Sequence, residues 1–550
     1  MQKNCLQCRA SFEIFPEDEK FYEKIAVPAP TLCPSCRQQR RLVFRNERSL
    51  YHRKCDLCGH QLISIYSPDK PHTVYCESCW WSDKWDPFQY GQDFDFSRPF
   101  FEQFQELLLK TPLPSINMNS DNENSAYTNL SSNNKNCYLA FASSDNEDCY
   151  YSTYLQRSKN ISDCFFIFDS ELCHECIDCY KCYNVSFSQF VENCRDSVFL
   201  NDCRGCNNCI GCVGLVNQQY QIFNEPCTKE EFEQKRAEIF SSRAKFDEAR
   251  SQFTALKEAT PHKYYSGVNN ENVTGDHVSF SKNASECYDC TYLEDCKYCV
   301  WMHRAKDCYD CYAFGYPGEL GYENQLCGNN FYNVKFSAWC TQDISNLTYC
   351  YYCNLNSKDL FGCVGLRKKQ YCILNKQYTK EEYDALVPRI IEHMGKTHEW
   401  GEFFPMSISP FAYNETVAQE YFPLTQEQVA KFGATWKNPD FTAVYQGPKI
   451  EVPFDIQHVP ETIIQNVLTC ETCHKNYKII EQEYRLYRQL GIPVPANCFN
   501  CRYNARRMLR NPRVLWDRAC AKCGASMQTT YAPERPEIIY CEKCYLEAVY

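Results

Sequence analysis

The most regular pattern along the chain is a ladder of cysteines spaced 15 residues apart, each preceded by an aspartate or an asparagine. A short fixed period is typical of a stacked repeat. If each unit forms one coil, equivalent positions stack about 4.8 Å apart, so the cysteines line the interior and the polar residue turns the corner. The pattern predicts a β-solenoid. The ladder consists of Cys149, Cys164, Cys179, Cys194 and Cys209.

A helical pattern follows this first lobe. Thr228 and Glu231 form a capping box, which predicts that a helix begins there. Apolar side chains then recur every seven residues, at Phe232, Ile239, Phe246 and Phe253, and give the helix one apolar stripe. We expect the stripe to pack on the chain's own solenoid, with homodimerisation through it as the alternative.

The segment after the helix repeats the first lobe. GCVGLVNQQYQIFN at 211–224 returns as GCVGLRKKQYCILN at 362–375, an offset of 151, and YNVSFS at 183–188 returns as YNVKFS at 332–337, an offset of 149. A two-residue insertion therefore lies between the two motifs in the second copy. The cysteine ladder itself is not reproduced. We expect a second solenoid lobe built to the same plan.

Cysteine pairs of the form C-x2-C mark both ends of the chain. Two such pairs can hold one tetrahedral ion, and four thiolate ligands leave no open position, so the pattern predicts four structural zinc sites. Each C-terminal ligand lies 465 residues after an N-terminal one. The spacing leaves open whether the ligands pair in order or cross-brace between neighbouring quartets. The ligands are Cys5, Cys8, Cys33, Cys36, Cys55, Cys58, Cys76, Cys79, Cys470, Cys473, Cys498, Cys501, Cys520, Cys523, Cys541 and Cys544.

These patterns predict a mainly β architecture of two tandem cysteine-rich β-solenoid lobes with interspersed helices, flanked by double zinc-ribbon modules. The expected order is a double ribbon (1–84), a linker with a short helix near Phe101–Leu109 (85–136), lobe 1 (137–227), the amphipathic helix (228–262), lobe 2 (263–378), a helix with an extended arm rich in proline and aromatic residues (379–469), and a second double ribbon (470–550).

The number of cysteines favours a reducing compartment. There are 41, an odd number, many of them in C-x2-C pairs, and the first residues lack the apolar run of a signal peptide. No stretch approaches 18 apolar residues, so no membrane span is expected. We expect a cytoplasmic protein with reduced thiols.

Charge is distributed unevenly along the chain. Residues 1–84 carry a net charge of +3 and residues 470–550 carry +5, whereas the whole chain carries −11, which leaves −19 for the middle. Any contact with a polyanion is therefore expected at the two ends.

The basic residues of the ends include two matching arginine faces. Arginines spaced as on one helix face follow the second C-x2-C pair of the first ribbon at each end, and guanidinium groups on one face suit phosphate partners. The alternative is that they pair with the acidic middle of the same chain. Pro512 is expected to end the second helix near Arg510. The residues are Arg37, Arg41, Arg45 and Arg48, matched by Arg502, Arg506, Arg510 and Arg513.

Lobe 1 also contains two clusters of the form C-x2-C-x2-C-x2-C, which lie two predicted coils apart and are therefore expected on the same edge of the solenoid. The spacing is similar to the cysteine run of bacterial ferredoxins, although the last gap is one residue shorter and the following proline is missing. Three interpretations stay open: buried structural thiols, extra zinc ligands, or an iron–sulfur cluster. The cysteines are Cys173, Cys176, Cys179, Cys182, Cys203, Cys206, Cys209 and Cys212.

The segments CLQCRASFEIFPEDEKFYEKIAVPAPTLCPSCR and CETCHKNYKIIEQEYRLYRQLGIPVPANCFNCR resemble the probable zinc-ribbon domain of many uncharacterised bacterial proteins. The order of ribbons, cysteine-rich repeats and ribbons resembles a family of uncharacterised proteins of candidate-phylum bacteria. The resemblance implies zinc and no particular activity.

No nucleotide-binding, hydrolase or metalloprotease motif accompanies these patterns. We therefore expect a non-enzymatic scaffold that binds about four zinc ions and contacts RNA, DNA or a nucleoprotein through its ribbons. The alternatives are a thiol or iron–sulfur redox protein that uses the central cysteines, and an adaptor that binds only protein.

Overall fold

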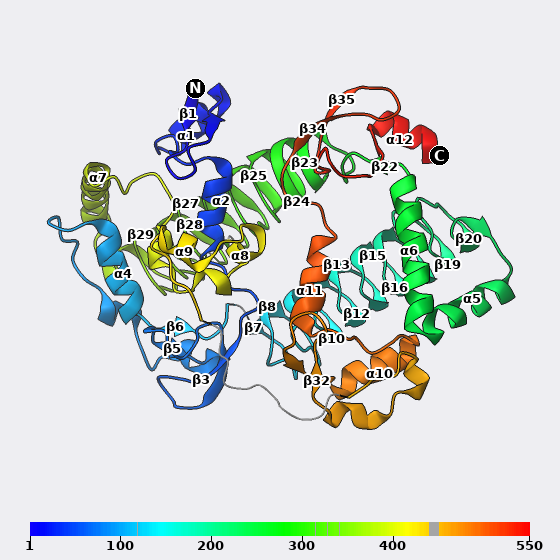
Figure 1. Cartoon of the computed structure of the whole chain (residues 1–550). Coiled ribbons are helices and arrows are strands. Elements are labelled where there is room, and N and C mark those ends of the chain that lie inside the picture. Colours follow the sequence, from blue (N-terminus) through cyan, green and yellow to red (C-terminus); the bar gives the residue numbers. More distant parts are fainter. Residues whose placement is uncertain (118, 314, 327, 340, 439–449, 550) are drawn as a thin grey trace. The chain divides into compact units, whose positions relative to one another are not determined.

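The computed structural model describes residues 1–550 except 118, 314, 327, 340, 439–449 and 550. Its contacts divide the chain into two compact units, each built from segments far apart in sequence (Figure 1). Unit 1 consists of Met1–Ile116, Tyr265–Asn438 and Arg513–Leu515, and unit 2 of Asn117–Tyr264, Pro439–Pro512 and Trp516–Tyr550. The N-terminal cysteine module thus folds with the second lobe, and most of the C-terminal module folds with the first.

Each terminal module consists of short hairpins and short helices. A glycine with φ 76° follows the first C-x2-C pair of the second ribbon in both copies, Gly59 and Gly524, where the tight turn requires a left-handed residue. The N-terminal elements are β1 (Gln2–Asn4), β2 (Ser11–Glu13), α1 (Pro16–Lys24), α2 (Pro34–Leu42), β3 (Tyr51–Lys54), β4 (Gln61–Ser64), β5 (Val74–Tyr75) and α3 (Glu77–Trp80). The C-terminal elements are β32 (Leu468–Thr469), β33 (Asn476–Tyr477), α10 (Glu481–Leu490), α11 (Phe499–Met508), β34 (Trp516–Ala519), β35 (Ser526–Thr529), β36 (Ile539–Tyr540) and α12 (Glu542–Val549).

The first lobe forms two large sheets, parallel throughout except for the last strand of the second, and the chain alternates between them every six residues. One sheet contains β7 (Asn119–Ser120), β8 (Asn129–Ser132), β9 (Phe141–Ser144), β11 (Thr153–Gln156), β13 (Phe165–Phe168), β15 (Ile177–Tyr180) and β17 (Gln189–Glu192). The second contains β10 (Glu147–Tyr150), β12 (Lys159–Ser162), β14 (Glu171–His174), β16 (Tyr183–Ser186), β18 (Arg195–Val198), β19 (Asn207–Ile210), β20 (Gln219–Ile222) and β21 (Glu225–Pro226).

The repeat of this lobe is 12 residues long, so the predicted 15-residue period is wrong. Glu147 pairs with Lys159, and Lys159 pairs with Glu171. Every third side chain of lobe 1 is buried in its interior. Two cysteines separated by one repeat plus three residues can therefore both lie in the interior without stacking on each other. The cysteine at 173 consequently stacks on Val185 of the next repeat. The two four-cysteine clusters are therefore not stacked on one edge as predicted.

The predicted corner role holds for two of the five polar residues that precede the ladder cysteines: Asp163 and Asn193 lie between strands, whereas Asp148, Asp178 and Asn208 lie within β10, β15 and β19. From Asp145 to Asp202, every third residue has a positive φ, including Asp148, Asp163 and Asp178 before their cysteines. Aspartate and asparagine adopt this left-handed conformation more readily than other non-glycine residues. The lobe nevertheless places leucine, phenylalanine and tyrosine in it as well, which the sequence does not reveal.

Interior cysteines and serines make the same hydrogen bonds. The Cys164 thiol donates to the carbonyl two residues earlier (3.3 Å), as the Ser152 hydroxyl does (2.8 Å). The Cys176 amide donates to the Cys164 sulfur at 3.4 Å, and the Cys164 amide donates to the Ser152 hydroxyl at 3.0 Å. A small side chain with one donor and one acceptor therefore suits these positions, and cysteine adds apolar surface to the interior.

The second lobe is built on one nine-stranded sheet with the same kind of parallel stacking. Four of its repeats are 13 residues long. Two of these, from Phe331 to Ile344 and from Ser345 to Lys358, account for the two-residue insertion predicted between the shared motifs. The strands are β23 (Glu271–Ser279), β24 (Lys282–Lys297), β25 (His303–Tyr309), β26 (Gly318–Tyr322), β27 (Phe331–Lys335), β28 (Ile344–Thr348), β29 (Lys358–Phe361), β30 (Gln370–Ile373) and β31 (Lys376–Gln377).

The motif shared by the two lobes ends each of them in the same way. The Asn375 side chain accepts from the Val364 amide and donates to the Val364 carbonyl, both at 2.8 Å, and thereby replaces the backbone of a further strand. Asn224 makes the equivalent pair with Val213 at 2.9 Å. An asparagine amide carries the donor and the acceptor that this position needs.

Helices cover the outside of the lobes. The predicted helix after lobe 1 is interrupted at Ser242, whose side chain caps the second of two helices. The ring centres of Phe246 and Phe253 lie 5.3 and 5.7 Å from the ring centre of Phe199 in lobe 1. The apolar stripe therefore packs within the chain. The described helices outside the terminal modules are α4 (Phe100–Lys110), close to the range predicted for it, α5 (Lys229–Ser241), α6 (Arg243–Ala259), α7 (Lys380–Lys396), α8 (Val417–Tyr421) and α9 (Gln426–Ala430).

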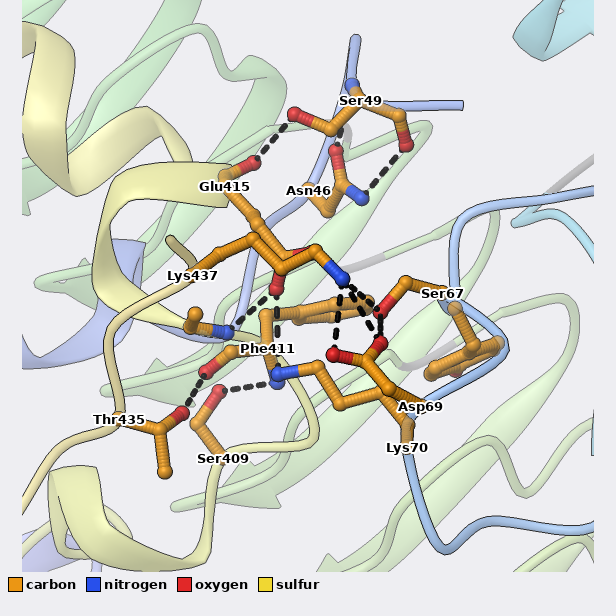
Figure 2. A network of polar contacts seen from close by, with 12 residues as sticks. Asn46, Ser49, Ser67, Asp69, Lys70, Ser409, Phe411, Glu415, Thr435 and Lys437 are labelled. Carbon is orange, nitrogen blue, oxygen red and sulfur yellow. Dashed lines mark hydrogen bonds and ion pairs between the residues drawn. The ribbon is translucent and has the colours of Figure 1, made fainter. Parts of the chain in front are cut away.

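The arm after α7 is attached to the N-terminal module by a polar network (Figure 2). Lys437 forms an ion pair with Asp69 at 2.8 Å, and Lys70 forms one with Glu415 at 3.2 Å. Residues 439–449 of the arm lie outside the described residues. Short elements complete the fold: β6 (Leu113–Pro114), which pairs with β5, β22 (His262–Lys263), which pairs with β36, and the 3-10 helices Pro87–Tyr90, Met406–Ile408, Tyr413–Glu415, Ile456–His458 and Glu461–Gln465.

We predict that Asn375→Ala lowers the stability of unit 1 by about 3 kcal/mol, because it leaves a buried amide and a buried carbonyl without partners. Asn224→Ala is the matched control and should cost less, because Asn224 is partly exposed and water can replace its amide. Hydrogen exchange read by peptide mass spectrometry measures the loss in each unit separately, which is needed because Asn375 belongs to unit 1 and Asn224 to unit 2. Equal losses in both variants would contradict the prediction.

Candidate metal centres and their charged supports

The 16 terminal cysteines form four groups of four, and in each group all four sulfur atoms lie within 4.8 Å of one another. Sulfur atoms that belong to different C-x2-C pairs lie 3.7 Å apart in Cys8–Cys33 and 3.8 Å apart in Cys58–Cys76. A tetrahedral ion with metal–sulfur bonds of about 2.3 Å requires about 3.8 Å between sulfurs. Each group could therefore hold one metal ion of the size of zinc.

The groups combine the pairs in sequence order, as Cys5–Cys8 with Cys33–Cys36 and Cys55–Cys58 with Cys76–Cys79. The C-terminal module uses the same order. The cross-braced alternative does not occur in this structure. Because each group already supplies four ligands, no coordination position is left for a substrate, which is typical of a structural site.

Backbone amides favour the thiolate form of the first cysteine of each group. Burial alone would raise the pKa of Cys55, but amides that include those of Cys76 and Cys58 outweigh it and lower the pKa to about 7. Cys520, its counterpart, has its pKa lowered to about 6 for the same reason. Since the thiolate is the form that binds metal, these amides prepare the sites for an ion.

In unit 1 the arginines of α2 are buried against carboxylates of lobe 2. Arg37 and Arg41 each have an exposed fraction of 1 %. Both contact Asp310, at 2.9 and 3.2 Å, and Arg40 contacts Glu323 at 2.8 Å. Asp310 occupies one of the left-handed corners of the lobe, with φ 61°. The corner therefore carries both the backbone turn and the ion pair.

Unit 2 contains the same interface. Arg502 and Arg506 contact Asp163 at 3.2 and 2.9 Å, and Arg506 also contacts Glu175 at 3.0 Å. Asp163 and Glu175 are one repeat apart, as Asp310 and Glu323 are in the other lobe. The duplication thus extends to the contact between ribbon and lobe.

The remaining predicted arginines are also engaged. Helix α2 ends before Arg45, which forms an ion pair with Glu47 and lies 4.7 Å from the centre of the Tyr312 ring; Arg48 lies 3.7 Å from Glu420. Helix α11 likewise ends at Met508, ahead of the predicted stop near Arg510. Beyond it, Arg510 contacts Asp178 at 2.8 Å, and Arg513 contacts Asp289 within unit 1 at 3.0 Å.

These contacts correct the interpretation of the arginine faces as phosphate-binding surfaces. Their guanidinium groups are held by carboxylates of the same chain, which was the alternative interpretation. Four of the eight predicted arginines lie beyond the helices instead of on one helix face. Contact between the ribbons and nucleic acid stays a prediction, but these side chains supply no free surface for it.

Sequence reasoning missed the acidic half of these interfaces. Asp18 caps α1 and forms an ion pair with Lys297 at 2.9 Å. Its counterpart Glu483 caps α10 and forms an ion pair with Arg502 at 3.0 Å. Asp18 and Glu483 are 465 residues apart, the offset that relates the zinc ligands, so the signal was present in the sequence. Asp163 and Asp310 gave no comparable signal, because their offset differs from those of the shared lobe motifs.

The eight central cysteines singled out in lobe 1 are buried in its interior. In the part of the chain that the structure describes, no three of them bring their sulfur atoms within 4.8 Å of one another. Elsewhere in the same interior, burial raises the pKa of Cys164 well above its usual value. The central thiols donate to backbone carbonyls, as Cys176 does to the His174 carbonyl at 3.4 Å, which favours the structural interpretation.

No protein-family model matches the chain, and no curated protein matches it. The resemblance to uncharacterised bacterial zinc-ribbon proteins therefore stays a prediction. Among the described residues, no helix has the length and apolarity needed to cross a membrane.

We predict about four metal ions per chain, as four closed groups require. Cys33→Ser should reduce the content by one, because it removes one ligand of the first group. Cys176→Ser is the matched control and should leave the content unchanged, since serine makes the same interior hydrogen bonds. Elemental analysis of anaerobically purified protein measures both. Loss of metal in the control would mean that central cysteines are ligands.

Removal of the shared carboxylate of unit 1 should be costly. Asp310→Asn leaves Arg37 and Arg41 buried without their common counter-charge, and we expect a loss of about 3–5 kcal/mol. Asp307→Asn removes only the more exposed pair with Lys24 and should cost at most about 1 kcal/mol. Urea unfolding followed by tryptophan fluorescence compares the free energies of unfolding of the two variants. Similar losses would contradict the larger contribution that we assign to the buried pairs.

The C-terminal interface should weaken in acid. The pKa of His174 is lowered to about 3, mainly by burial; Asp163 opposes this shift, and Arg502 and Arg506 add to it. The ordinary pKa of histidine is 6.5, so between about pH 6.5 and 3 the unfolded chain binds more protons than the folded chain. The stability of the fold therefore decreases as the pH is lowered, by up to about 1.4 kcal/mol per pH unit.

Hydrogen exchange of the amides of α10 and α11 at pH 7.5 and 5.5 measures this loss. His174→Tyr is the control, because lobe 2 carries Tyr322 at the equivalent position, one residue before Glu323. The variant should lose most of the pH dependence. An unchanged pH dependence in the variant would show that another group is responsible.

Proposed function

We propose that the chain is a non-enzymatic, zinc-stabilised binding scaffold of a reducing cytoplasm. In this proposal the two lobes are β-solenoids, the terminal modules hold four zinc ions, and each module is fixed to a lobe by buried ion pairs. The single observation that carries the proposal is the duplicated interface, in which Arg37 and Arg41 share Asp310 as Arg502 and Arg506 share Asp163.

The duplication supports an architectural role for the metal. A four-cysteine site folds a small module that has little hydrophobic core of its own. Each such module in turn supplies the helix whose arginines contact the lobe. Loss of zinc would therefore be expected to release the arginines and expose the acidic corners of both lobes.

The redox alternative has less support. Redox cysteines are accessible and have a lowered pKa, because the thiolate is the reactive form. The central cysteines are instead buried and donate hydrogen bonds to carbonyl groups. An adaptor that binds only protein would use the same scaffold and would differ from the proposed function only in its partner.

Alkylation of the thiols, read by peptide mass spectrometry, tests the proposal. In the metal-loaded protein we expect Cys227 to react, since it is partly exposed and belongs to none of the four groups, while the terminal and central cysteines stay protected. After chelation the terminal cysteines should react and the central ones should lag. Central cysteines that react first, or that oxidise reversibly in the native protein, would favour the redox alternative.

A further inference from the structure

Unit 1 carries an exposed tryptophan beside Arg367, the first of three consecutive basic residues. Trp81 immediately follows α3, two residues after the ligand Cys79, and has an exposed fraction of 42 %. The guanidinium carbon of Arg367 lies 5.3 Å from the centre of the Trp81 ring, and Lys368 and Lys369 follow it in the sequence. We call Trp81, Arg367, Lys368 and Lys369 the Trp81 patch.

The patch rests on a rigid aromatic base. Arg367 also lies 5.6 Å from the ring centre of Trp80 and 5.4 Å from that of Trp85, both of which are buried. The ammonium group of Lys369 lies 4.4 Å from the centre of the Phe88 ring. The faces of these rings attract cations and hold them in place without neutralising their charge.

The cations of the patch have no close counter-ion. Among the described residues, no carboxylate oxygen lies within 4.0 Å of Arg367, Lys368 or Lys369 in the ion pairs of the chain. The arginines of the terminal helices, in contrast, are paired and buried. Asp83 and Asp86 are near enough to influence Arg367 electrostatically and will moderate the positive potential of the patch.

The duplicated unit shows that the fold does not require these residues. Lobe 1 has Val216, Asn217 and Gln218 where lobe 2 has the three cations, in the shared motif offset by 151 residues. The C-terminal module has Leu546 where the N-terminal one has Trp81, at the offset of 465. Both units nevertheless form the cysteine groups and the arginine interface. The patch is therefore an addition to the common architecture.

We propose that the Trp81 patch binds single-stranded nucleic acid, with a base stacked on Trp81 and phosphates held by Arg367, Lys368 and Lys369. This inference rests on the proposed function, since it names the partner of the scaffold. An exposed indole takes the flat face of any base, and neighbouring cations follow the phosphate backbone. A duplex hides its base faces, and an acidic peptide offers no flat ring to Trp81, so a single strand uses more of the patch.

Three phosphate contacts predict a weak, salt-dependent interaction. For a single strand the slope of log Kd against log salt concentration is about 0.7 for each neutralised phosphate, which gives about 2 for this patch. Binding without sequence preference falls in the range of about 1–100 µM at moderate salt. The overall charge of −11 works against binding elsewhere on the chain.

The test uses the full metal-loaded chain and a fluorescein-labelled 15-residue oligothymidylate, followed by anisotropy between 25 and 200 mM salt. One variant is Trp81→Ala. The second combines Arg367→Val, Lys368→Asn and Lys369→Gln, which is the sequence lobe 1 itself has, with Lys368 and Asn217 in the same left-handed conformation. Leu546→Ala is the matched control.

We expect the wild type and the control to bind with a slope near 2, and each of the two patch variants to bind about 10-fold more weakly or worse. Equal binding by the patch variants would overturn the inference. The inference would also be overturned if polyglutamate displaced the labelled oligonucleotide as well as unlabelled oligonucleotide does. That result would indicate that the patch binds an acidic protein segment. Metal content is measured on the same samples: a wild type with four metal ions that fails to bind overturns the inference alone, whereas a folded chain without metal overturns the proposed function.

Discussion

The structure depends on one contact that occurs twice, the pairing of two buried arginines with one buried aspartate at a corner of each lobe. In each unit, the metal-binding module contributes the arginines and the lobe contributes the carboxylates. Buried charges are costly to desolvate, so such a contact adds little to stability over an apolar one, but it is intolerant of error because an unpaired charge is strongly destabilising. The contact therefore contributes more to the specificity of the interface between module and lobe than to its stability.

The interiors of the lobes follow a different principle. Every third residue of lobe 1 between 145 and 202 adopts a left-handed conformation, which most side chains adopt only at some cost. Parallel pairing of each repeat with the next and the hydrogen bonds of interior cysteines and serines oppose that cost. Cysteine is abundant here because it is small, apolar and still able to donate to a carbonyl. Its abundance at the chain ends has a separate cause, the four groups that could hold metal.

Much of this could be predicted from the sequence where ligand chemistry or exact duplication left a sharp pattern. The four cysteine groups, the corner role of Asp163 and Asn193, and the cap at Thr228 follow from local rules. The repeat length did not, because interior positions recur every three residues and the cysteines that occupy them happen to be 15 apart. The partners of Arg37 and Arg502 were also out of reach, since they are set by contacts between segments hundreds of residues apart.

The most direct test of this account is zero-length carbodiimide cross-linking of the intact chain, read by peptide mass spectrometry. The account predicts a link between Lys24 of the N-terminal module and Asp307 of lobe 2, whose charged atoms are 2.8 Å apart at an accessible edge of the interface. The exposed helical pair Lys396 and Glu392, at 2.7 Å, serves as the internal control. Recovery of both links would support the pairing of the N-terminal module with the second lobe. Recovery of the control without the Lys24–Asp307 link would contradict it.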